Sequence, residues 1–151
     1  MIREIFERVT GLITSLEDLN YIYGDEAWLN FYLEKIERKP VLGARLVSGT
    51  IDSFANPNRN LSVSVNVFLG VRTELDFTPT QHDQALVSVY RSAFEMLDRL
   101  GDKEAYPELI HAGNGSINNI TFNELLNESD ANYTILLLSF NMKVKNPFDR
   151  C

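Results

Sequence analysis

The stretch that decides the fold is Leu61 to Val71, with the sequence Leu-Ser-Val-Ser-Val-Asn-Val-Phe-Leu-Gly-Val. An apolar residue stands at every odd position, and polar residues or glycine fill most of the positions between them. This period-two alternation is typical of a β-strand with one buried face and one more polar face. Val41 to Ile51 is the predicted preceding strand, and Ala55 to Asn60 has the composition of a turn. We therefore expect the two strands to form an antiparallel hairpin.

Helical spacing of apolar residues predicts three helices. The first runs from Ile2 to Leu19, and a shorter one from Asp25 to Ile36 ends before a proline. The third runs from Thr80 to Leu100, and Gly101 is well placed to end it. We expect Thr80 to cap this helix by accepting a hydrogen bond from the amide near Asp83.

Two further strands are predicted at Ile117 to Leu125 and Tyr133 to Val144. The expected fold class is α+β, with an antiparallel sheet of about four strands and helices packed on one face. The expected element order is α-α-β-β-α-β-β. We expect one domain over residues 1–145 and a short C-terminal tail over residues 146–151.

The charge of the chain disfavours nucleic-acid binding. Its 151 residues carry 14 basic and 21 acidic side chains, for a formal net charge of −7, and no Lys/Arg cluster is visible. Cys151 is the only cysteine, so neither an internal disulfide nor a cysteine-rich metal site is expected. Charged residues interrupt the N-terminal segment, and the longest aliphatic run, Ile135 to Leu138, is short. These features predict a soluble protein made inside the cell.

We found no motif that predicts catalysis, a cofactor or a metal. His82 and His111 are the only histidines, and they lack the spacing of a helical zinc site. The loop around Asn114 lacks the lysine of a phosphate-binding loop. The acidic pair Asp25 and Glu26 is explained by a helix cap. An enzyme with a carboxylate site that includes Asp25, Glu26 or Asp83 is a residual hypothesis.

Surface segments are the better candidates for function. The predicted turn, with Asn56, Pro57, Asn58 and Arg59, and the connection Pro107 to Ser116, with His111 and Asn114, are polar and long enough to project. We expect that deleting Pro107 to Ser116 leaves folding intact and reduces assembly. A dense group of aromatic residues has two open interpretations, core packing or a contact surface. Its members are Tyr21, Tyr23, Trp28, Phe31 and Tyr32.

The order of these segments resembles a known family. An N-terminal amphipathic helix precedes Pro-Val-Leu-Gly-Ala-Arg-Leu-Val-Ser-Gly (40–49) and the alternating strand that begins at Leu61. The long helix, a long loop and Ala-Asn-Tyr-Thr-Ile-Leu-Leu-Leu-Ser-Phe (131–140) follow. This layout, over Ile2 to Val144, resembles the tail-terminator or tail-completion proteins of tailed bacteriophages and related head–tail joining proteins. The aromatic segment Tyr21 to Tyr32 departs from the family pattern.

The resemblance implies a structural virion protein with no catalytic residues. Such subunits assemble as homo-oligomeric rings at the neck, beside portal, neck or tail proteins, and DNA passes through the channel without specific binding. An acidic chain suits a channel that must not hold DNA. The alternative hypothesis is a small acidic adaptor or inhibitor that binds a partner protein as a monomer or dimer.

Overall fold

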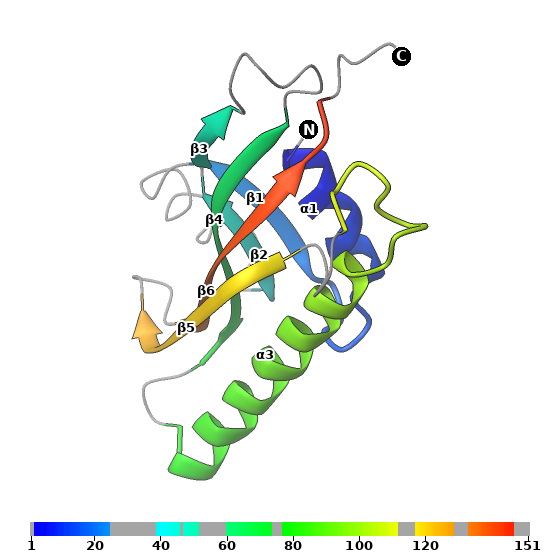
Figure 1. Cartoon of the computed structure of the whole chain (residues 1–151). Coiled ribbons are helices and arrows are strands. Elements are labelled where there is room, and N and C mark those ends of the chain that lie inside the picture. The colour runs from blue at the N-terminus through cyan, green and yellow to red at the C-terminus, as the bar shows by residue number, and fades with distance from the viewer. Residues whose placement is uncertain are drawn as a thin grey trace.

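The computed structural model describes residues 2–24, 39–45, 47–51, 60–73, 77–111, 117–128 and 133–146. Figure 1 shows a single sheet with helices beside it. The elements, in chain order, are α1 (Ile2–Leu12), β1 (Asn20–Gly24), β2 (Val41–Arg45), β3 (Ser48–Ile51), β4 (Leu61–Arg72), α3 (Pro79–Leu100), β5 (Ile117–Glu128) and β6 (Tyr133–Val144).

The sheet is mixed and has six strands, so the expected sheet of four antiparallel strands is wrong. Its strand order is β1-β2-β4-β6-β5, and β3 also pairs with β4. β1 and β2 are parallel, whereas every other pair is antiparallel. The observed element order is α-β-β-β-β-α-β-β. The short strand β1 was missed because its five residues, Asn20 to Gly24, show no long alternation.

The predicted hairpin strand Val41 to Ile51 is divided into β2 and β3. Both pair with β4, β2 near its C-terminal end (Val41 opposite Gly70) and β3 near its N-terminal end. Gly49 explains how closely β3 approaches: a Cβ atom added there would lie 2.0 Å from the backbone oxygen of Ser62. The antiparallel pairing of this segment with β4 is therefore as predicted, although the strand is interrupted.

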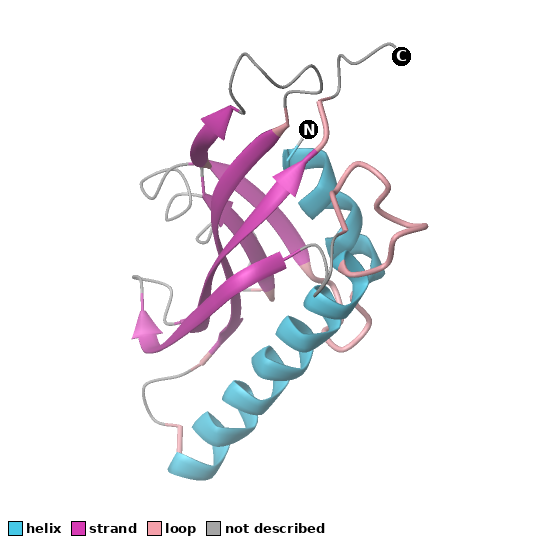
Figure 2. Cartoon of the chain, viewed as in Figure 1, coloured by secondary structure: helices cyan, strands magenta, loops and turns pink. Residues whose placement is uncertain are grey.

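Alternation along β4 and β6 separates two faces of the sheet. Val65 lies opposite Phe140 and Val67 opposite Leu138, and all four side chains are buried on one face. Both helices pack on this face, which we call the helix face (Figure 2). The second face carries a smaller apolar cluster of Ile22, Val41, Phe68, Tyr133 and Ile135. The remainder of that face is polar, as the alternation predicted.

The helices are close to their predicted positions, with two differences at their ends. α1 ends at Leu12, not Leu19, one residue after Gly11, which is a weak helix former. α3 begins at Pro79 and not at Thr80. Thr78 is the N-cap and accepts from the Gln81 amide, while the Gln81 side chain accepts from the Thr78 amide, as in a capping box. The predicted cap at Thr80 is therefore wrong by two residues.

Several predicted features lie outside the described residues. These are the helix Asp25 to Ile36, the turn residues Asn56, Pro57, Asn58 and Arg59, and Trp28, Asn114 and Cys151. The predicted strand Ile117 to Leu125 is present and extends to Glu128, and the predicted strand Tyr133 to Val144 is confirmed.

Candidate assembly surface

An exposed apolar patch lies on α3 and the neighbouring strand β5. Phe94 is 64% exposed and Phe122 is 59% exposed. The rings of Tyr90 and Phe122 meet edge to face, with centroids 5.9 Å apart. Val87 and Phe94 lie one helical turn on either side of Tyr90, so they share its side of α3. We call Val87, Tyr90, Phe94 and Phe122 the α3–β5 patch; large apolar side chains grouped in this way mark interaction surfaces.

The patch adjoins an edge of the sheet. In the part of the chain that the structure describes, β5 has one strand neighbour, β6. Register shifts interrupt this pairing between Asn118 and Thr121 and again between Leu125 and Glu128, and Asn119 at the first shift has a φ of 54°. Bulges of this kind limit how much of an edge strand can pair with another chain. The regular window between them is Thr121 to Leu125.

The opposite edge of the sheet is β1, which contains the candidates Tyr21 and Tyr23. Both are half-buried and pack against the main core, on the helix face. The Tyr21 hydroxyl donates to the backbone oxygen of Arg3 in α1 (3.0 Å). Burial raises the pKa of Tyr21 above its ordinary value. These two tyrosines therefore contribute to packing while they remain partly accessible at the edge.

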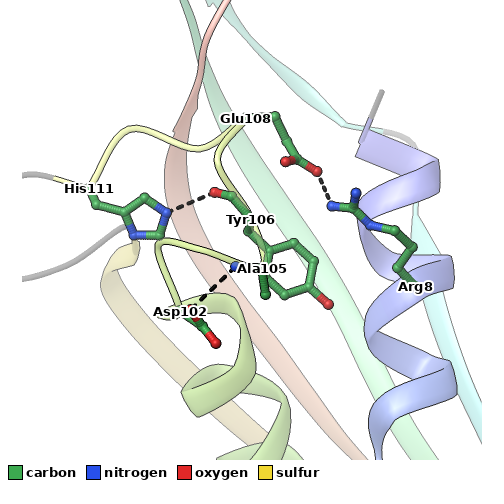
Figure 3. A network of polar contacts seen from close by, with 6 residues as sticks. All are labelled: Arg8, Asp102, Ala105, Tyr106, Glu108 and His111. Atoms are coloured by element: carbon green, nitrogen blue, oxygen red, sulfur yellow. Dashed lines mark hydrogen bonds and ion pairs between the residues drawn. The ribbon is translucent and has the colours of Figure 1, made fainter.

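The connection that follows α3 packs against the sheet and α1, so the expectation that all of it projects is wrong. Leu109 is buried and bridges Val144, and the amides of Ile110 and Lys145 bond to the carbonyls of Lys143 and Glu108. Figure 3 shows the Arg8 guanidinium beside Glu108, with which it forms an ion pair, and close to the ring of Tyr106.

The candidate residue His111 is part of the same network. Its Nε2 lies 2.9 Å from the carbonyl oxygen of Tyr106, to which it donates (Figure 3). Asp102 accepts from the amides of Glu104 and Ala105 and so shapes the turn that leads there. His111 therefore stabilises this connection from within, and its half-buried ring is a poor centre for a partner contact.

A polar groove lies on the second face of the sheet, where β3, β4, β5 and β6 come together. It has a volume of about 260 Å³. Its polar lining includes Thr50, Ser64, Asn118, Asn141 and Lys143. Ser64 donates to the Asn141 side-chain oxygen (3.1 Å). Hydroxyls, amides and one ammonium group can donate and accept hydrogen bonds, but these side chains do not include a base that would activate a nucleophile.

A carboxylate joins the end of α1 to α3. Glu95 accepts from the amides and hydroxyls of both Thr14 and Ser15, at 2.7–3.2 Å. Burial alone would raise the pKa of the Glu95 carboxyl, but these hydrogen bonds outweigh burial and lower it below its ordinary value. Since the ionised form is the better acceptor, Glu95 holds the segment after α1 most firmly when it is charged.

We expect Glu95→Gln to lower the free energy of unfolding by about 1–2 kcal/mol at neutral pH, because it weakens these hydrogen bonds. A lowered pKa in the folded state gives stability that is present above the unfolded pKa of about 4.5 and is lost as the pH falls through the folded value. Urea unfolding measured at neutral and acidic pH should therefore show a smaller loss on acidification in the variant. Glu104→Gln, at an exposed position, is the control; equal effects of the two would contradict the assignment.

Metal binding and membrane spanning were searched for in the same residues. Across the described ranges, no group of three or more His, Cys, Asp or Glu residues could hold a metal ion. Within them, too, no helix is long and apolar enough to cross a membrane. Among the carboxylates considered for catalysis, Asp83 lies exposed in the first turn of α3, and Asp25 and Glu26 are outside the described residues.

Comparison with known proteins gives no family for this chain. No family model matches it, and no curated protein is significantly similar in sequence.

Sequence reasoning missed the α3–β5 patch. The predicted apolar stripe of the long helix included Tyr90 and left out Val87 and Phe94, which lie off that stripe. Two large apolar residues seven positions apart, on the side of a helix that faces away from its core stripe, are the signal that could have identified the surface. Phe122 could not be found in this way, because alternation does not say which face of an edge strand is covered.

Proposed function

We propose that this protein is a structural subunit of a tailed-phage virion that forms a homo-oligomeric ring at the neck or tail junction. The observation that carries the proposal is the uncovered α3–β5 patch beside the edge strand β5. Apolar side chains next to unpaired backbone groups are what a second protein chain can bury. The sequence resemblance to phage neck and tail proteins supplies the location.

In this proposal the neighbours of the ring are portal, neck or tail proteins, and DNA passes through its channel. The net charge of −7 supports passage without specific binding, since a channel that gripped phosphates would need basic residues. Contacts around such a ring are heterologous: one surface of a subunit meets a different surface of the next.

The native mass of the purified chain, measured across a concentration series with negative-stain images of the largest species, tests the proposal. We expect the mass to rise with concentration towards one closed ring. A fixed monomer or dimer at every concentration would count against the ring and favour the alternative, a small acidic adaptor or inhibitor of a partner protein.

A further inference from the structure

We propose that the α3–β5 patch and the β5 edge bind the β1 edge of a second copy of this chain, so that the sheet continues from subunit to subunit. This inference rests on the ring proposed above and names its contact. In the described residues, β5 and β1 are the two ends of one sheet, and each has a single strand neighbour. A surface with two different free ends can repeat head to tail, which is the heterologous contact that closes rings.

Strand direction and length agree with this pairing. β5 runs antiparallel to β6, β6 to β4 and β4 to β2, while β1 is parallel to β2, so β5 and β1 run in opposite directions. A rotation about an axis along the strands keeps these directions and therefore brings β5 antiparallel to the β1 of the next copy. The regular window of β5, Thr121 to Leu125, has five residues, as β1 has.

The faces of the two strands agree as well. Phe122 and Glu124 point to the helix face of β5, and Tyr21 and Tyr23 to the helix face of β1. Full antiparallel pairing of the two five-residue segments places Phe122 opposite Tyr23 and Glu124 opposite Tyr21. A slip of one residue would put these side chains on opposite faces, so the pattern specifies the register. Aromatic cross-strand pairs stabilise such contacts.

The helix layer explains why β5 needs a second copy. α1 packs against β1 and β2, whereas α3 packs against β4 and β6, which leaves β5 beyond the helices (Figure 1). Edge pairing would bring the α1 that covers β1 of the second copy alongside the α3–β5 patch. Leu12, the exposed apolar residue at the end of α1, is available to contact it.

Charge supports the same partner. β5 carries two acidic residues, Glu124 and Glu128, and no basic residue. At the β1 edge, the charges that reach Tyr21 are those of Arg3 and Glu7, and the effect of Arg3 is the larger. In the register described above, Glu124 faces Tyr21 of the second copy and so approaches Arg3. Attraction between them favours β1 over a second β5, whose own Glu124 and Glu128 would repel.

Cysteine cross-linking tests the pairing. In a Cys151→Ser background, we expect the double variant Phe122→Cys with Tyr23→Cys to give a ladder of covalent oligomers under mild oxidation. Within one chain the two positions lie on opposite edges, four strand spacings or roughly 19 Å apart, too far for a disulfide. Each single variant should give no ladder. Circular dichroism and thermal unfolding verify that each variant folds.

A charge variant gives an independent result. Phe122→Glu should raise the concentration needed for assembly at least tenfold, roughly, because the carboxylate would be desolvated between two subunits. Ile51→Glu is the matched control, since Ile51 is an exposed apolar residue on β3, away from both edges, and should leave assembly unchanged.

The outcomes separate this inference from the proposed function. If the wild-type chain forms rings but the double-cysteine variant gives no ladder, the β5–β1 contact is wrong and the ring proposal stands. Covalent dimers from Phe122→Cys alone would show β5 pairing with β5 and would also overturn the inference. A wild-type chain that never assembles overturns the ring proposal, and this contact with it.

Discussion

Replacing Phe6 with alanine lowers the free energy of unfolding by about 3–5 kcal/mol. Phe6 in α1 is fully buried, and its ring lies 6.2 Å, between centroids, from that of Phe140 in β6. It therefore joins the first helix to a central strand of the sheet. Truncation removes buried apolar surface and leaves a cavity that neighbours on two different elements cannot readily fill, because their backbones are held by the helix and the strand pairing.

Urea unfolding followed by circular dichroism measures this effect. Leu12→Ala is the matched control: it shortens an apolar residue at the end of the same helix, but Leu12 is 41% exposed, so we expect a much smaller change. A loss below about 1 kcal/mol for Phe6→Ala, well under the range for a buried phenylalanine, would show that α1 is not packed on the sheet as described.

Replacing Leu109 with alanine lowers the free energy of unfolding by about 2–5 kcal/mol. Leu109 is fully buried in the main core, although it lies in the connection between α3 and β5. Its backbone extends alongside the end of β6, with the bridge to Val144 and hydrogen bonds on both sides. The substitution thus creates a cavity and loosens the segment that carries Tyr106 and Glu108 onto α1.

Lys103→Ala is the control, because Lys103 is exposed in the same connection and should change stability by no more than about 0.5 kcal/mol. Thermal unfolding of both variants measures the difference. The same reasoning revises the deletion of Pro107 to Ser116: it removes a core side chain, so we expect it to destabilise the domain and not only to reduce assembly. A Leu109→Ala variant as stable as Lys103→Ala would restore the original expectation.

The fold was predictable where one segment carries a long periodic pattern. The alternation in β4 and in β6 and the apolar stripe of α3 each extend over many residues, so their type and approximate bounds follow from local sequence. The N-cap of α3 was misplaced by two residues because Thr78 and Thr80 are both suitable capping residues. Pro79, at the first helical position, identifies Thr78 as the correct one.

The candidate surface was much less predictable. Of the residues proposed as contacts, Tyr21 and Tyr23 lie at an edge of the sheet, whereas His111 is bonded within its own connection. The polar connection was expected to project because its composition is that of a loop. Leu109 contradicts this: a single apolar residue in a polar segment shows no periodicity, yet it is buried once β6 offers backbone groups to pair with.

The sequence by itself determined the α+β class, the positions of the long elements and which side chains of each face the core, because these follow from periods that adjacent residues share. Only the tertiary structure decided the parallel pairing of β1 with β2, the order of the strands and the exposure of the α3–β5 patch. The physical reason is that strand pairing joins residues far apart in the chain. Which elements form the edges of the sheet, and which apolar side chains stay uncovered, depends on the whole packed arrangement.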